Sequence, residues 1–143
     1  MEQTKEIQIE YRLVKIDINK FDIHPEGLKD GEVSFQTEVQ FAYSNIQHSV
    51  RCRLCVNLVQ QENPLMESEA DCHFELNPDS VNRMKQDENI VIPAPILIQF
   101  ASLCYGTMRG IIHTKTIDTP INRFILPPMY FHEIIKQDFM AKV

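Results

Sequence analysis

The feature that most constrains the fold is a long apolar stretch that runs from Pro93 to Thr114. Pro93 and Pro95 suit the start of a helix, where the first residues need no backbone N–H donor. The stretch therefore predicts a helix over about residues 94–114. When its residues are placed at 100° intervals, apolar side chains fill about twice the arc of about 100° that a helix on one core requires. We expect this helix to be covered on more than one side, either by its own domain and a partner subunit or by two layers of one domain.

The polar and small residues of this stretch share one narrow arc, and they are Gln99, Ser102, Gly106, Arg109 and Gly110. Ser102, Gly106 and Gly110 recur every four residues, so they form a strip along one side of the helix. Small side chains would let another backbone approach closely, which predicts an oligomer interface at Ser102, Gly106, Arg109 and Gly110. A solvent-facing strip that tolerates glycine explains the same pattern, and the sequence leaves both interpretations open.

Four segments before this stretch alternate apolar and polar side chains, with the period of a half-buried strand. They lie between about residues 6 and 76 and are joined by short turns, which favours one antiparallel sheet with an apolar face. The phase of the first segment slips near Leu13 and Val14, which predicts a β-bulge. The tail over residues 129–140 has helical spacing. The sequence therefore predicts a single α+β domain, residues 1–143, in which a long helix and a short final helix cover a four-stranded antiparallel sheet.

Composition restricts the class of protein. The chain has 143 residues and a formal net charge of −6 at pH 7, which argues against a nucleic-acid-binding protein. Its first residues lack the apolar core of a signal peptide. Residues 90–112 are long and apolar enough to raise the question of a membrane span, but two prolines, Gln99 and Arg109 argue against one. We expect a cytoplasmic protein without stable membrane insertion.

Signals for catalysis or metal binding are few. Cys52 and Cys55 form a C-x-x-C pair, but residues three apart on a strand point to opposite faces, and the sequence has no second pair of this spacing. Reduced thiols in a cytoplasmic protein are the better interpretation. His132 and Glu133 match the start of a zincin motif, yet Lys136 occupies the place of its second histidine. We expect no enzyme activity, no metal and no cofactor.

The fourth predicted strand presents a row of acids on its polar face, namely Glu67, Glu69, Asp71 and Glu75. Like charges in one row repel each other unless a partner meets them. A solvated edge strand that its charge protects from aggregation is one interpretation. A docking stripe for a basic partner is the other.

The C-terminal third contains a long apolar helix and, after it, an extended segment rich in proline. The apolar, proline-started helix from Pro95 to Gly110 ends in the pair Arg109-Gly110, and an extended, proline-bearing segment follows it. The run from Ile125 to Ile135 then leads into the tail and contains Pro128 and Phe131. Together these stretches resemble the SecB family of protein-export chaperones, in which Pro128 and Phe131 fall on matching positions. The layout of four strands before the helix agrees with that family over nearly the whole chain.

The resemblance implies a fold, an assembly and a function. SecB proteins combine a four-stranded antiparallel sheet with a long and a short helix, and they assemble as a dimer of dimers whose long helices pack between the sheets. They hold unfolded preproteins in long apolar grooves without ATP and pass them to the translocase motor SecA. By this resemblance the protein is a holdase chaperone for unfolded polypeptides, dimeric or tetrameric, of the export type or of the toxin–antitoxin-associated type.

The resemblance also implies which residues act. The groove of the family is lined by the crossover, here residues 21–31, by the second strand and by the segment around the last helix. The corresponding side chains are Phe21, Ile23, Val33, Phe35, Phe124, Leu126, Met129, Tyr130 and Phe131. Apolar contact is non-directional, which suits the binding of many clients. A SecA-like partner would dock on Glu67, Glu69, Asp71 and Glu75.

A hypothesis of another class is a small apolar-ligand-binding protein with a closed pocket between sheet and helix. An elongated groove that is open at both ends would favour the chaperone, and a sealed cavity of roughly a few hundred Å3 would favour the ligand-binding protein. A third possibility is a structural subunit whose apolar surfaces are used entirely in assembly.

Overall fold

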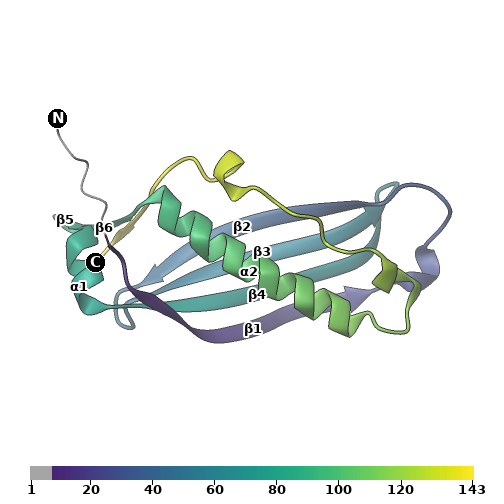
Figure 1. Ribbon diagram of the computed structural model, residues 1–143, viewed down its shortest axis with the longest axis horizontal. Coiled ribbons are helices and arrows are strands. Elements are labelled where there is room, and N and C mark those ends of the chain that lie inside the picture. Colours follow the sequence, from purple (N-terminus) through teal and green to yellow (C-terminus); the bar gives the residue numbers. More distant parts are fainter. Residues whose placement is uncertain (1–7) are drawn as a thin grey trace.

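The computed structural model describes residues 8–143, so Ile7 of the predicted first strand lies outside the described residues. The chain forms a large sheet, one long helix and a small second sheet (Figure 1). The strands are β1 (Tyr11–Ile23), β2 (Ser34–Ser44), β3 (Ser49–Gln60), β4 (Asn63–Leu76), β5 (Lys85–Gln86), β6 (Asn89–Ile92) and β7 (Phe139–Lys142). The helices are α1 (Pro78–Met84) and α2 (Ala94–Lys115), with 3-10 turns η1 (Pro25–Gly27), η2 (Pro120–Arg123) and η3 (Phe131–Glu133).

The large sheet has the order β1-β4-β3-β2, and all of its pairs are antiparallel. Helix α2 lies diagonally across one face and packs on the two central strands, β3 and β4 (Figure 1). The predicted α+β fold, with a four-stranded antiparallel sheet and a long helix, is confirmed. In the part of the chain that the structure describes, α2 and the other helices are too short or too polar to cross a bilayer.

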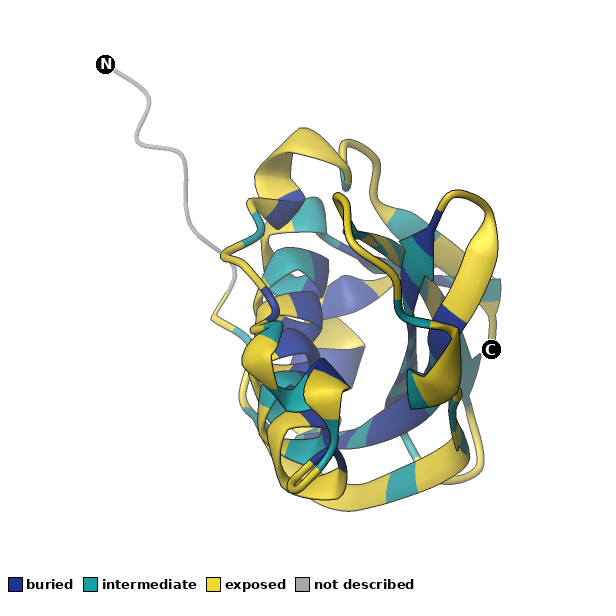
Figure 2. Ribbon diagram, turned by 90° about the vertical axis from the view of Figure 1, so that its right-hand side faces the viewer, coloured by how far each residue is buried: buried dark blue, intermediate teal, exposed yellow. Residues whose placement is uncertain are grey.

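The core lies between α2 and the sheet, where Figure 2 shows buried residues on the facing sides of both. The inner residues of β3, from Val50 to Leu58, have no exposed surface. At one end of α2 the rings of Phe74 and Phe100 stack with centroids 4.3 Å apart, and Tyr11 meets both rings edge-on. This aromatic cluster joins the edge strand β1 to the helix.

Two β-bulges keep most of the apolar residues of strand β1 on one face. The pairing of β1 with β4 shifts between Leu13 and Lys15, and again between Ile18 and Lys20. As a result six apolar residues of β1 lie opposite the buried, core-facing residues of β4, and they are Tyr11, Leu13, Ile16, Ile18, Phe21 and Ile23. The bulge predicted near Leu13 and Val14 is confirmed. The second was not predicted, because the sequence pattern places the start of a loop at Phe21.

The loop between β1 and β2 is held by one buried side chain. The Gln60 amide accepts a hydrogen bond from the Lys29 backbone N–H at 2.8 Å and donates to the carbonyls of Lys29 and Gly31. Gly31 has φ of +129°, a conformation that residues with a Cβ rarely adopt. The conformation of this crossover therefore depends on Gly31 and on the Gln60 side chain of β3, which hydrogen-bonds to the crossover backbone.

The final helix predicted over residues 129–140 is wrong. The chain from 124 to 138, which we call the strap, runs back along α2 in extended form with only the short turn η3, and strand β7 follows it (Figure 1). Phe131, Ile134 and Ile135 have helical spacing, but they lie in the strap. The residues that follow form β7, which pairs with β6 to build the sheet β5-β6-β7. Asp138 accepts a hydrogen bond from the Ala94 N–H at the start of α2. These partners are distant in sequence, so local spacing did not reveal them.

Candidate binding groove

Two adjoining clefts form a groove between β2 and the C-terminal part of the strap. The first has a volume of about 330 Å3 and is lined by Thr37, Glu38, Val39, Gln40, Phe131 and Ile134. The second has a volume of about 440 Å3 and is lined by Val39, Phe41, Leu97, Ile134, Ile135, Lys136, Gln137, Asp138 and Phe139. Both are open to solvent, and they share Val39 and Ile134. We call this continuous surface the β2 groove.

The position of α2 explains why the groove lies along β2. The helix packs on β3 and β4, so it covers their inner faces and leaves the inner face of the edge strand β2 partly open. Val39 and Phe41 are therefore half-buried, whereas Leu54 and Cys52, their partners on β3, have no exposed surface. The strap forms the opposite wall, where Ile134 remains 54% exposed.

The client-binding residues suggested by the sequence occupy several places. Six are half-buried against the core, and these are Phe21, Ile23, Val33, Phe35, Phe124 and Met129. Leu126 and Phe131 are only 2% exposed, and Tyr130 is 62% exposed on the strap. Of the nine residues, Phe131 lines the β2 groove. Phe21 and Ile23 belong to β1, the opposite edge of the sheet.

Sequence reasoning did not assign the main groove residues, which are Val39, Phe41, Ile134, Ile135 and Phe139. Val39 and Phe41 share the alternation phase of Phe35, so the strand pattern contained a signal for that wall. Ile134 and Ile135 gave no such signal, because the pattern assigned them to the apolar stripe of a helix.

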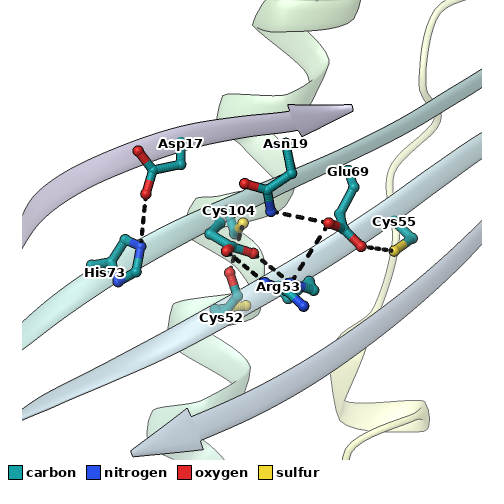
Figure 3. A network of polar contacts seen from close by, with 9 residues as sticks. Asp17, Asn19, Cys52, Arg53, Cys55, Glu69, His73 and Cys104 are labelled. Atoms are coloured by element: carbon teal, nitrogen blue, oxygen red, sulfur yellow. Dashed lines mark hydrogen bonds and ion pairs between the residues drawn. The ribbon is translucent and has the colours of Figure 1, made fainter. Parts of the chain in front are cut away.

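The acidic row of β4 is met by basic residues of the neighbouring strands. Figure 3 shows the part of this network around Arg53 and Glu69. Arg53 donates two hydrogen bonds to Asp71, at 2.9 and 3.0 Å, and its Nε lies 3.8 Å from Glu69. The other pairs are Lys20 with Glu67 at 2.6 Å and Arg12 with Glu75 at 3.0 Å. Each carboxylate of the row thus has a cationic neighbour within the sheet, which relieves the repulsion that the sequence alone indicated.

The pKa values of this network follow from burial and charge. Burial alone would raise the pKa of the Asp71 carboxyl, but the hydrogen bonds and charge of Arg53 bring it below its usual value. Glu69 also accepts from Asn19 at 3.0 Å and from the Cys55 thiol at 3.4 Å. Burial and then the Glu69 carboxylate raise the pKa of Cys55 to about 11. The Cys55 side chain is therefore a neutral thiol near pH 7.

All four cysteines are free thiols. Cys52 and Cys72 are opposite each other on the inner faces of β3 and β4, and Cys104 of α2 lies above them with its thiol directed at the Cys52 carbonyl at 3.7 Å. These three thiols have no exposed surface, and Cys55 lies on the other face of the sheet. Within residues 8–143, histidine, cysteine and acidic side chains form no group of three that could hold a metal ion.

The small-residue strip of α2 faces away from the sheet. Ser102, Gly106 and Gly110 are exposed, and a Cβ at either glycine would meet no heavy atom within 4 Å. Arg109 is different, because its Nε donates to the Leu126 carbonyl of the strap at 3.1 Å. In the single chain, the strip is open to solvent and Arg109 is bound to the strap.

A second apolar surface lies where α2 borders β1. Tyr11 donates a hydrogen bond to Gln99 at 2.8 Å, and the Lys115 ammonium lies 5.6 Å from the centre of the Phe21 ring. These contacts align the two ends of α2 with β1. The apolar residues between them keep 41–47% of their surface exposed, and they are Leu13, Ile16 and Ile18 of β1 with Leu103 of α2. Val14, the residue of the first bulge, lies instead on the outer face of the sheet beside His73 and Glu75. We call Leu13, Ile16, Ile18 and Leu103 the β1 flank.

No protein-family model matches this chain, and no curated protein matches its sequence.

Proposed function

We propose that the protein is an ATP-independent holdase chaperone that binds unfolded polypeptide segments in the β2 groove and acts in the cytoplasm. The observation that carries this proposal is the groove itself, which joins two clefts, is mainly apolar and is open to solvent along an edge strand. An unfolded chain exposes apolar side chains in no fixed order, and apolar contact is non-directional, so such a groove accepts many sequences.

The edge position of β2 adds a second means of binding. An edge strand has backbone N–H and C=O groups without partners in its sheet, and an extended peptide can pair with them. The side chains of such a peptide would then alternate between the groove and solvent. Backbone pairing gives affinity for any extended client, while Val39, Phe41 and Ile134 favour apolar residues.

We further propose that the protein is a homo-oligomer, a dimer or a tetramer, in which a second copy covers the β1 flank. Isolated exposed apolar residues are common, but four in one place mark a contact surface. The open strip of Ser102, Gly106 and Gly110 lies on the outer side of the same helix and would permit close approach of that copy. This assembly leaves the β2 groove, at the opposite edge of the sheet, free for clients.

Docking of a SecA-like partner on the acidic row has less support. Glu67, Asp71 and Glu75 each already have a basic partner on a neighbouring strand. A basic protein would have to compete with Lys20, Arg53 and Arg12 for them. The proposed client holding in the β2 groove does not depend on this docking.

The experiment that tests the proposal compares two variants at exposed isoleucines. Ile134→Asp places a charge in both clefts, and Ile46→Asp places one at the tip of the β2–β3 turn, where the side chain is 93% exposed and outside the groove. The mass of the complex with a reduced, carboxymethylated and hence permanently unfolded protein is measured by light scattering. We expect the wild type and Ile46→Asp to bind this client, and Ile134→Asp to bind it at least fivefold more weakly while its circular dichroism is unchanged. Equal binding by both variants would refute the β2 groove as the client site, and absence of binding by the wild type would refute the holdase.

A further inference from the structure

A third cleft, outside the β2 groove, lies between the last turns of α2 and the start of the strap. Its volume is about 340 Å3, and its lining consists of Arg109, Ile112, His113, Phe124, Ile125 and Leu126. We call it the Arg109 cleft. It shares no lining residue with the β2 groove. Four of its six residues are apolar, and Ile125 leaves 65% of its surface exposed at this site.

The cation of this cleft is held in place by the fold. The Arg109 Nε donates to the Leu126 carbonyl at 3.1 Å, and its guanidinium carbon lies 5.5 Å from the centre of the Tyr105 ring. These two contacts fix the guanidinium before any ligand arrives, so binding would cost little side-chain entropy. A second cation, Arg123, lies 4.9 Å from the centre of the Phe124 ring beside the cleft.

Arg109 has no acidic partner in the described chain. The ion pairs among residues 8–143 involve Arg12, Lys15, Lys20, Arg53 and His73, and none involves Arg109. The cleft also contains no aspartate or glutamate, although the chain has 20 acidic residues against 14 basic ones. An unpaired guanidinium beside an apolar wall is complementary to a molecule with one carboxylate and an apolar body.

We infer that the Arg109 cleft binds a small aliphatic carboxylic acid, with its carboxylate on the guanidinium of Arg109 and its chain against Ile112, Phe124 and Ile125. The volume lies at the lower end of the range for small-molecule sites. At about 30 Å3 for each water-sized group, it holds a carboxylate and a chain of about eight to ten carbons. Such a ligand would cover the exposed surface of Ile125. This inference does not depend on the proposed holdase function.

The test measures binding of octanoate and of 1-octanol by titration calorimetry at pH 7.5. The two probes have the same chain and differ in charge, so their comparison isolates the contribution of Arg109. We expect one octanoate per chain, bound at least tenfold more tightly than 1-octanol. Arg109→Gln should remove this preference, and circular dichroism checks that the variant is folded.

A second pair of variants tests the apolar wall without touching Arg109. Ile125→Ser should weaken binding of both probes about fivefold. Ile117→Ser is the matched control, because Ile117 is also largely exposed, at 54%, and lies outside the cleft. Both substitutions are at exposed positions, so both variants should fold.

Four results would overturn the inference. Equal affinity of the wild type for octanoate and 1-octanol would remove the role of the cation, and equal effects of Ile125→Ser and Ile117→Ser would remove the role of the wall. Loss of octanoate binding in Ile134→Asp would place the acid in the β2 groove instead. A peptide with a C-terminal leucine that binds the Arg109 cleft as tightly as octanoate would overturn the assignment to a small acid.

Discussion

Replacing Asp71 by asparagine should lower the free energy of unfolding by about 2–3 kcal/mol at pH 7. The Asp71 side chain is only 6% exposed and accepts two hydrogen bonds from Arg53. Asparagine keeps one acceptor but turns an NH2 group toward the guanidinium donors, so at least one charge-assisted bond is lost. Such a bond contributes about 1.5–3 kcal/mol when its loss leaves a partner unsatisfied. Arg53 is 30% exposed, so water partly replaces the lost bond and the upper figures for fully buried pairs do not apply.

The same pair predicts a dependence on pH. Arg53 holds the pKa of the folded Asp71 carboxyl below its usual value, despite the opposing effect of burial. A depressed pKa in the folded state gives stability that is present above the unfolded pKa, about 3.9, and is lost as the pH falls through the folded value. The difference in stability between the wild type and Asp71→Asn should therefore be full at pH 7 and should shrink as the pH falls below about 4.

Urea unfolding followed by circular dichroism at pH 7 and at pH 3 measures both effects. Glu75→Gln is the matched control, because Glu75 lies on the same face of β4 and also pairs with an arginine, but its side chain is 45% exposed and that of Arg12 is 73% exposed. An exposed pair of this kind contributes about 0–1 kcal/mol. Equal losses for the two variants at pH 7, or an Asp71→Asn loss that is undiminished at pH 3, would refute the assignment of the stability to the buried pair.

Two further substitutions test the α2 strip and the outer face of the sheet. Gly106→Leu should leave the single chain folded, because a Cβ there meets no heavy atom within 4 Å, but it should lower the mass measured by light scattering; an unchanged oligomer would show that the strip faces solvent. Cys55, whose pKa burial and Glu69 raise to about 11, should react slowly with iodoacetamide at pH 8. Glu69→Gln should speed this reaction severalfold and Glu67→Gln should not, and equal rates for all three proteins would remove Glu69 as a cause.

The alternation of apolar residues was sufficient to predict the four strands and the cover by α2, because each strand buries one face and the pattern records which face. It did not predict the order β1-β4-β3-β2, since pairing between β1 and β4 depends on contacts across more than 40 residues. The tail could not be predicted for the same reason. The spacing of Phe131, Ile134 and Ile135 fits a helix locally, but the chain after them pairs with β6, which is distant in sequence. One wall of the β2 groove comes from the strand pattern of β2, and the other comes from the strap, whose path depends on the pairing of β7 with β6. Only the β2 wall could therefore be predicted from the sequence.

The two bulges of β1 have a consequence for changes in chain length. Thirteen residues of β1 span the same distance as the eleven residues of β4 from Met66 to Leu76, so the strand carries two residues more than its pairing requires. Loss of Val14 would remove the first register shift and loss of Asn19 the second, and either change would leave the remaining apolar residues on their present faces. Loss of a residue such as Asp17 would instead turn the rest of the strand over. Strand β1 thus has two positions at which one residue can be lost without changing which side chains face the core.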